Sequence, residues 1–336
     1  HDYVSKEVIN VRENVGLIEV ANFSKHEFKG PDARKFLDHI MAGRLPKPGR
    51  ISLSPMLSYR GKLCGDLTVA CLDENEFMVF GSGAAQEMHR RWFESHIDKF
   101  NLSYSNRSDE YHGLSIAGPN SRKVLEKIVR DDVSNEKFKF RDSRRMFVGG
   151  VPAIINRISF TGELGYEIYV APHYQLKLYE ELMEAGKEFN IKPFGGRALM
   201  SMRLEKNWGA WTLDYRPDFT AKETGLDAFI NWDKEFIGKE SAQKENSSNK
   251  LIPLIVETNE IDVTNNEAVL NGDQSIGYVT SGGFAHFVNK SVAFTFVDQK
   301  NIKSENKIQV EINGDLFNCS IIKEPLYDPS GQKMRS

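Results

Sequence analysis

Two segments of the chain place carboxylates where they could take part in chemistry. Asp66 lies inside the otherwise apolar run 63–69, and Glu163 and Glu167 flank a glycine-containing bend within residues 160–167. A buried or half-buried carboxylate is costly unless it meets a charged or hydrogen-bonding partner. Two such segments in one chain predict a pocket lined with hydrogen-bond acceptors, which suits a cationic or donor-rich ligand.

Each carboxylate also has an ordinary structural interpretation. Asp66 could sit at a strand edge or bulge, Glu163 could be a solvated turn residue, and Glu167 could belong to a solvated strand face with Tyr169. The residues alone leave these alternatives open.

Other motifs in the chain carry less chemistry. Gly81-Ser82-Gly83 follows a predicted strand and precedes a predicted helix, as in a dinucleotide site, but Gln86 holds the third glycine position. A tight turn whose free N–H groups face a cleft is the better interpretation. The three cysteines have no C-x-x-C spacing, so we expect no metal site.

Length and composition limit the class of protein. A chain of 336 residues predicts two or three domains, and its net charge of −3 gives no reason to expect nucleic-acid binding. No run approaches the ~20 apolar residues of a membrane span. Three cysteines without a disulfide pattern favour a reducing compartment, and we expect the cytoplasm. The first residues show neither an initiator Met nor a targeting signal, so we expect a chain cut from a longer polypeptide.

Strand and helix patterns alternate along the chain in two similar series. The first series predicts strands at 15–20, 26–30, 66–72 and 76–80, and helices from residue 31 onward and at 84–97. The second series predicts strands at 114–117, 151–158 and 167–170, and helices at 122–129 and 174–189. A polar linker at 243–250 precedes short strands typical of a small β-barrel or sandwich. The predicted fold class is α+β, with domains at 1–110, 111–242 and 251–336.

Several short segments occur in a characteristic order over essentially the whole chain. They are residues 11–18, 28–33, 63–69, 116–119, 161–167, 202–206, 236–240 and 280–283. Each is weak alone, but their order resembles the aminomethyltransferase family. That family includes the glycine-cleavage T-protein and the tetrahydrofolate-binding C-terminal half of dimethylglycine and sarcosine dehydrogenases. The resemblance implies two intertwined ferredoxin-like α+β domains and a C-terminal β-barrel, arranged as a ring around a central folate channel.

The resemblance also implies site residues. Asp66 corresponds to the catalytic aspartate, and Glu167 matches the glutamate that accepts the paired N–H and amino donors of the pterin. Trp211 occupies the place of an aromatic that lines the pocket, and Phe160 stands where relatives often carry Tyr. Ser82, in the turn that follows the second hairpin strand, completes this group.

The chemistry explains why an aspartate is needed. Oxidation of an N-methylglycine gives an iminium carbon that the folate N5 attacks, and N10 must lose a proton to close the methylene bridge. A fixed, partly desolvated carboxylate at Asp66 can stabilise the cation and help to take that proton.

The chain departs from the glycine-cleavage pattern at three positions. Leu53 replaces a pocket Tyr, Leu199 replaces a ligand-binding Arg and leaves Arg197 as the nearest basic side chain, and Asn313 lies where the barrel offers another Arg. These changes argue against a lipoyl-bound substrate. They are less damaging for the dehydrogenase branch, where the iminium arrives from a flavin site. Residues 324–329 also resemble that branch. We therefore expect FAD on an upstream module or a partner subunit, outside this chain.

The expected function is tetrahydrofolate-dependent methylene transfer, which gives 5,10-methylenetetrahydrofolate from a small demethylated glycine derivative. One alternative is a non-catalytic folate-binding scaffold, which the missing arginines favour and Asp66 disfavours. Another is a glycine-cleavage aminomethyltransferase. The iron–sulfur-maintenance branch of the same fold carries a Lys-Gly-Cys motif, which this sequence lacks.

Overall fold

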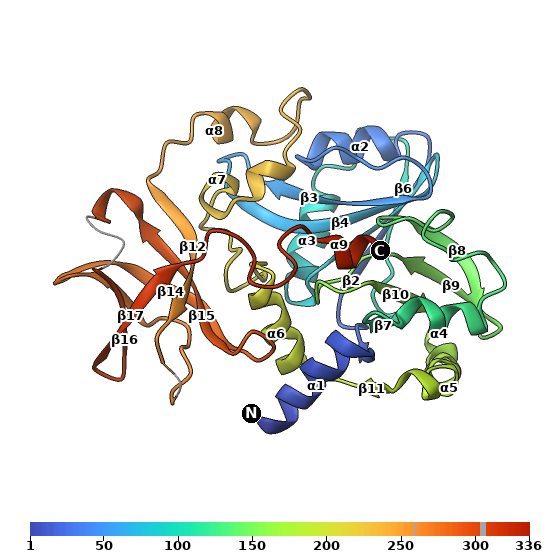
Figure 1. Cartoon of the computed structure of the whole chain (residues 1–336). Helices are drawn as coiled ribbons and strands as arrows, with labels where there is room; N and C mark the ends of the chain where they lie inside the picture. The colour runs from blue at the N-terminus through green and yellow to red at the C-terminus, as the bar shows by residue number, and fades with distance from the viewer. Residues whose placement is uncertain (259, 303–306) are drawn as a thin grey trace.

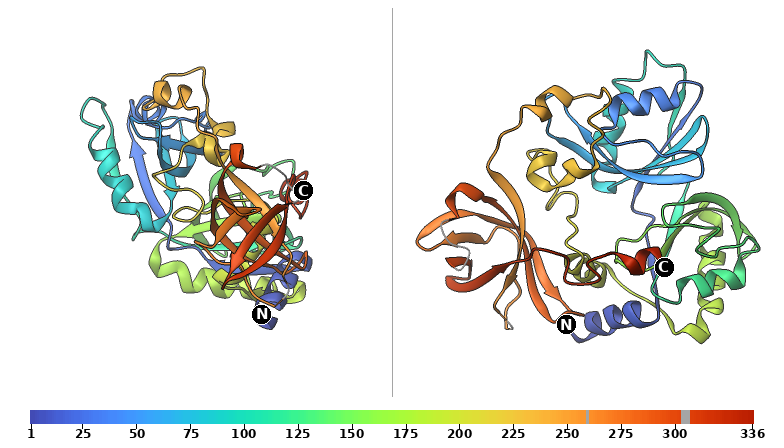
Figure 2. Two further views of the ribbon diagram at one scale, coloured as in Figure 1. Left: turned by 90° about the vertical axis from the view of Figure 1, so that its left-hand side faces the viewer. Right: turned by 45° about the horizontal axis from the view of Figure 1, so that its top comes forward.

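The computed structural model describes residues 1–258, 260–302 and 307–336. It contains a five-stranded sheet, a six-stranded sheet and a closed six-stranded barrel, arranged around a common centre (Figures 1 and 2). The prediction of a mixed α and β fold that ends in a β-barrel is confirmed. Among the helices that the structure describes, none combines the length and apolar character of a membrane span.

The five-stranded sheet is antiparallel throughout and carries Asp66. Its strands, in spatial order, are β3 (Arg50–Leu57), β4 (Leu63–Asp73), β5 (Glu76–Gly81), β2 (Ser24–Lys29) and β6 (Ser103–Asn106). The helices α2 (Ala33–Ile40) and α3 (Gln86–Glu94) contribute Phe36 and Phe93 to the hydrophobic core on one face, which also holds Leu67 and Val69. Because side chains alternate along a strand, Asp66 and Thr68 project from the opposite face.

The six-stranded sheet carries Glu167. Its strands, in spatial order, are β11 (Ile191–Pro193), β1 (Val15–Glu19), β7 (His112–Ala117), β10 (Gly165–Val170), β9 (Val151–Asn156) and β8 (Ser143–Val148). Tyr166 and Ile168 of β10 lie in the core shared with α4 (Ser121–Ile128) and α5 (Gln175–Ala185). Strand β1 precedes the five-stranded sheet in the chain but pairs in this one, so the two sheets are intertwined. The domain boundaries at 110 and 242 stay predictions.

The inner faces of the two sheets pack on one another through an apolar layer. Its buried members are Val20, Ile51, Ala70, Met78, Phe80, Ile154 and Tyr169. The rings of Phe80 and Tyr169 join the sheets, with centroids 4.7 Å apart. Strand alternation therefore directs Asp66, on the same face as Ala70, and Glu167, on the same face as Tyr169, into the space between the sheets.

The barrel closes in the strand order β12 (Asn249–Val256), β15 (Lys290–Asp298), β14 (Gln274–Ala285), β13 (Ala268–Asn271), β16 (Ile308–Ile312) and β17 (Asp315–Ile321). Closure removes the unpaired strand edges that a sandwich would leave. The predicted linker at 243–250 is shorter, because α8 (Lys239–Gln243) and β12 occupy its ends. The remaining helices are α1 (Asp2–Glu13), α6 (Gly196–Glu205), α7 (Ala221–Thr224) and α9 (Gln332–Arg335).

Two predicted helices are shorter than expected, and five of the described helices were not predicted. The predicted helix 84–97 contains α3, preceded by a 3₁₀ turn at Gly83–Ala85, and the predicted helix 174–189 ends as α5 at Ala185. Short 3₁₀ turns at helix ends are common and leave little trace in hydrophobic spacing. The helices that were not predicted from the sequence are α1, α6, α7, α8 and α9.

A buried ionic cluster joins α1, the loop before β10, α6 and the C-terminal segment. Arg12 donates to Glu205 at 3.1 and 2.5 Å, to Glu163 at 3.1 Å and to the carbonyl of Thr161 at 2.7 Å. Its guanidinium lies over the ring of Tyr327 at 3.8 Å, and the Tyr327 hydroxyl donates to Glu163. Glu163 is therefore neither a solvated turn residue nor an acceptor in a ligand pocket, because buried partners take up its charge.

Candidate active site

Asp66 is a half-buried carboxyl in the middle of β4. Within the described residues, no ion pair or hydrogen bond reaches its side chain other than that from its own backbone N–H. Desolvation raises its pKa from 3.8 to about 7. A carboxyl in this state can stabilise a cation when ionised and can exchange a proton near neutral pH.

Glu167 is a half-buried carboxyl on β10 that already holds one protein donor. The hydroxyl of Tyr169 donates to Oε2 at 2.8 Å, while no described residue donates to Oε1. Burial raises the pKa of Glu167 to about 7, opposed by the Tyr169 hydrogen bond and by the charge of Lys25. Oε1 therefore remains available to accept a hydrogen bond from a ligand.

The strand register places both carboxylates beside the contact between Phe80 and Tyr169. Thr68 pairs with Phe80, and Asp66 lies two residues before Thr68 on the same face. Glu167 likewise lies two residues before Tyr169. Ser82, just beyond the end of β5, falls opposite Asp66 when the same register is continued.

The aromatic loop, residues 208–215, packs in a hydrophobic cluster that also contains residues of β3, β4 and the barrel. Trp211 and Leu53 are half-buried and pack against a hydrophobic cluster that contains Tyr215. The Trp211 ring lies 6.1 Å from the ring of His89. Burial raises the pKa of Tyr215, and the charge of Asp66 raises it further.

Phe160 and Arg197 are the other two predicted site residues. Phe160 is half-buried in the loop between β9 and β10, and Arg197 is exposed in the first turn of α6. No contact in the described structure joins either one to Asp66 or Glu167. Their roles stay predictions.

Residues that the sequence analysis did not select also shape the site. Lys25, on β2, is fully buried and lies 5.7 Å from the centre of the Tyr169 ring. Desolvation lowers the pKa of Lys25 to about 8 although Glu19, Asp109 and Glu167 oppose the shift. No sequence signal marked Lys25, because Ser24–Lys29 is mostly polar and its burial depends on tertiary packing.

His89 supports the strand that carries Asp66. It is buried on α3, and its Nε2 lies 3.0 Å from the carbonyl oxygen of Cys64, two residues before Asp66. Desolvation lowers the pKa of His89 to about 4, so the ring is neutral and Nε2–H is the donor. A Cβ on Gly65 would lie 2.9 Å from Nε2, so this glycine permits the approach of the ring.

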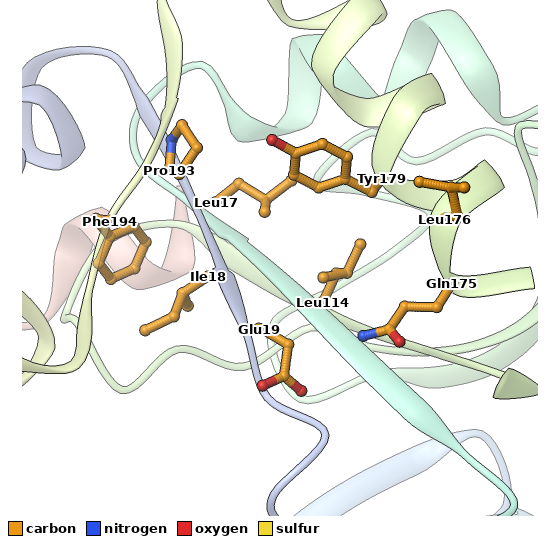
Figure 3. A pocket seen from close by; sticks show the side chains of 9 residues that line it. All are labelled: Leu17, Ile18, Glu19, Leu114, Gln175, Leu176, Tyr179, Pro193 and Phe194. Carbon is orange, nitrogen blue, oxygen red and sulfur yellow. The ribbon is translucent and has the colours of Figure 1, made fainter.

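One apolar groove lies away from these residues. It has a volume of about 460 Å³ and lies between β1, β11 and α5, where Figure 3 shows its side chains. It is lined by Leu17, Ile18, Glu19, Leu114, Gln175, Leu176, Tyr179, Pro193 and Phe194. None of the predicted site residues contributes to it.

Comparison with known protein families defines the class. Residues 1–234 match the GCVT N-terminal domain, and residues 249–328 match the glycine cleavage T-protein C-terminal barrel domain. The chain therefore belongs to the glycine-cleavage T-protein, or aminomethyltransferase, family. The predicted family membership is confirmed.

Individual members of the family show how similar this chain is to proteins of known class. The chain is 34% identical over 331 residues to the mitochondrial dimethylglycine dehydrogenase of Mus musculus, covering 96% of this chain but only 38% of that protein. It is 28% identical to the aminomethyltransferase of Thermoanaerobacter pseudethanolicus, covering 96% of this chain and 89% of that protein. The crystal structure of glycine cleavage system aminomethyltransferase T from Bartonella henselae has the same fold, with a TM-score of 0.87, 23% identity, and coverage of 97% and 90%.

Proposed function

We propose that this chain binds tetrahydrofolate and transfers to it a one-carbon unit at the oxidation level of formaldehyde. The observation that carries the proposal is the pair of half-buried carboxyls, Asp66 and Glu167, on facing sheets of an aminomethyltransferase-family fold. Both have raised pKa values of about 7, and neither is neutralised by a direct ion pair within the described residues.

The residues present fit a reduced pterin. Glu167 offers Oε1 as an acceptor, and Oε2 can accept a further donor besides the Tyr169 hydroxyl. The half-buried Trp211 offers an aromatic face, with Leu53 on the same wall. Tetrahydrofolate, when bound, supplies the two nitrogens that take up the carbon.

Asp66 would act on the incoming carbon. Its carboxylate stabilises the positive charge of the iminium and takes the proton that must leave as the second carbon–nitrogen bond forms. Overall, the iminium and tetrahydrofolate give 5,10-methylenetetrahydrofolate, the free secondary amine and one proton. Asp66 has no competing hydrogen-bond partner among the described side chains.

We propose a demethylated glycine derivative as the carbon source. The 34% identity with a dimethylglycine dehydrogenase and the Leu53 and Leu199 replacements support this branch over a lipoyl-bound substrate. The iminium would then come from a flavin module outside this chain. The cytoplasm stays the predicted compartment, and the free thiols of Cys64, Cys71 and Cys319 fit a reducing one.

The direct test of ligand binding is calorimetric titration with tetrahydrofolate of the wild-type protein and of Glu167→Ala. We expect Glu167→Ala to weaken binding by about 10- to 100-fold, because hydrogen bonds to a charged group contribute about 1.5–3 kcal/mol each. Glu181→Ala, on the outer helix α5, is the matched control and should titrate like wild type. Identical curves for Glu167→Ala and wild type would remove Glu167 from the binding site.

The pKa of Glu167 predicts that folate binding depends on pH. Only the ionised carboxylate accepts two donors, so affinity should fall as pH drops through about 7, approaching tenfold per unit. Tyr169→Phe removes a donor that lowers this pKa, so the midpoint should move to higher pH. The titrations are done in an Asp66→Asn background, so that only one of the two carboxyls titrates.

Tyr166→Phe is the control for this pH profile. Tyr166 is on the same strand but points into the core on the opposite face, so its midpoint should match wild type. A Tyr169→Phe midpoint equal to that of wild type would show that Tyr169 does not set the ionisation of Glu167.

A further inference from the structure

The loop that carries Trp211 and Tyr215 is anchored by a fully buried ion pair. Arg203, near the end of α6, donates from Nη1 to Oδ2 of Asp214 at 2.7 Å. The same Nη1 donates to the carbonyl of Trp208 at 3.1 Å, where the loop begins. The side chains of Arg203 and Asp214 are 1% and 0% exposed, so neither charge is screened by water.

Asp214 also joins this loop to the barrel. Its Oδ2 accepts the backbone N–H of Ala210 at 2.9 Å, and its Oδ1 accepts the hydroxyls of Thr280 at 2.5 Å and Ser281 at 2.7 Å. Ser281 in turn accepts a hydrogen bond from Nη2 of Arg203 at 2.8 Å. One carboxylate therefore ties α6, the aromatic loop and β14 together.

A bulge in the barrel strand β14 allows two consecutive residues to hydrogen-bond to Asp214. Neighbouring side chains on a regular strand point to opposite faces. The pairing of β14 with β15 shifts between Val279 and Ser281, and such an irregularity redirects side chains. Thr280 and Ser281 can therefore both reach Oδ1 of Asp214.

The aromatic loop needs this support because its backbone is strained. Thr212 has a φ of 71°, a left-handed conformation that is unfavourable for a β-branched residue. Such strain persists only where surrounding contacts over-determine the conformation. Here the Thr212 N–H donates to the Tyr215 carbonyl at 2.9 Å, and the Asp214 N–H donates to the Ala210 carbonyl at 2.9 Å.

We propose that Asp214, held by Arg203, Thr280 and Ser281, is a positioning residue that sets the position of Trp211 against the sheet that carries Asp66. Through it, the C-terminal barrel controls the geometry of carbon transfer. This inference rests on the proposed function only for its effect on turnover. The effect on the conformation of the loop does not depend on any ligand.

The test replaces the barrel hydroxyl rather than the buried charge. Thr280→Val keeps the side-chain shape and removes one donor to Asp214, and Thr280→Ser restores the hydroxyl. Thr295→Val is the matched control, because Thr295 is a fully buried barrel residue that donates to the Ile252 carbonyl at 2.8 Å instead. The Thr280 hydroxyl also lies 3.1 Å from the Phe294 carbonyl, but its single proton can be donated to only one acceptor at a time. Both Val variants therefore lose one buried donor, so a general loss of stability affects both.

Two readouts separate positioning from stability. With 5-fluorotryptophan labelling, the ¹⁹F resonance assigned to Trp211 by Trp211→Phe should shift in Thr280→Val, return in Thr280→Ser and stay in place in Thr295→Val. In the folate assay with an iminium source, Thr280→Val should lower kcat by about tenfold or more, since small displacements at a reacting centre are costly. Thr280→Ser should recover that rate, and Thr295→Val should keep it.

Failure of the positioning role of Asp214 and failure of the proposed function give different results. An unmoved Trp211 resonance in folded Thr280→Val, or the same shift in Thr295→Val, would overturn the positioning role. A wild-type protein that binds no tetrahydrofolate would overturn the proposed function, while the ¹⁹F result would still decide the role of Asp214. A shifted resonance with an unchanged kcat would overturn the control of turnover by the barrel.

Discussion

Asp66→Asn is expected to slow methylene transfer by about 10²- to 10⁴-fold, the range for loss of a positioned acid–base group. The amide has nearly the same shape but can neither carry the negative charge nor take a proton. Because Glu167 is unchanged, tetrahydrofolate affinity should stay within a few-fold of wild type. Single-turnover capture of an iminium, generated from formaldehyde and N-methylglycine, measures the rate after subtraction of the reaction without protein.

The pH profile gives this prediction a second signature. The wild-type rate should rise as pH increases through about 7, because the raised pKa of Asp66 leaves the carboxyl protonated below that value. At saturating tetrahydrofolate, where the ionisation of Glu167 no longer limits the rate, Asp66→Asn should lose this rise. Asp73→Asn, at the exposed end of the same strand, is the control and should keep the wild-type rate and profile. Equal turnover by Asp66→Asn and wild type would remove Asp66 from the catalytic step, and a wild-type rate no higher than that without protein would favour a folate-binding scaffold.

Arg12→Ala is expected to lower the free energy of unfolding by about 3–5 kcal/mol, the usual loss when one partner of a buried ion pair is removed. The change leaves Glu163 and Glu205 buried without their shared cation. It also removes the guanidinium from the ring of Tyr327, which connects the C-terminal segment to this cluster. Denaturant-induced unfolding followed by circular dichroism measures the loss.

The control for this prediction is an arginine with similar pairing at the surface. Arg90 pairs with Glu87 and Glu94 on the exposed side of α3, where ion pairs contribute about 0–1 kcal/mol. Arg90→Ala should therefore leave the unfolding transition almost unchanged. If Arg12→Ala unfolds at the same denaturant concentration as Arg90→Ala, the buried ionic cluster around Arg12 does not contribute the expected stability.

Glu167 shows how far local patterns can reach. Strand alternation placed it on the same face as Tyr169, and the order of short segments matched it to the pterin glutamate. What alternation could not show is that Tyr169 donates to it and that Lys25 lies below the Tyr169 ring. Lys25 comes from a different sheet, far away in the chain.

Glu163 shows where local patterns fail. It lies four residues from Glu167 in the same motif, and the sequence allowed both a solvated turn and a pocket acceptor. The structure gives it Arg12, 151 residues away, and Tyr327, 164 residues away. The environment of a carboxylate depends on such partners, and chain folding alone brings them together.

The family, the fold class and the candidate carboxylates Asp66 and Glu167 could be read from the order and spacing of residues, because strand periodicity and glycine turns act over a few positions. Three features depended on tertiary contacts. These are the use of Glu163 in a structural cluster, the ionisation states of the two candidate carboxyls, and the hydrogen bond that Thr280 donates to Asp214. The physical reason is that desolvation and charge pairing are set by atoms that become neighbours only after the sheets and the barrel have packed.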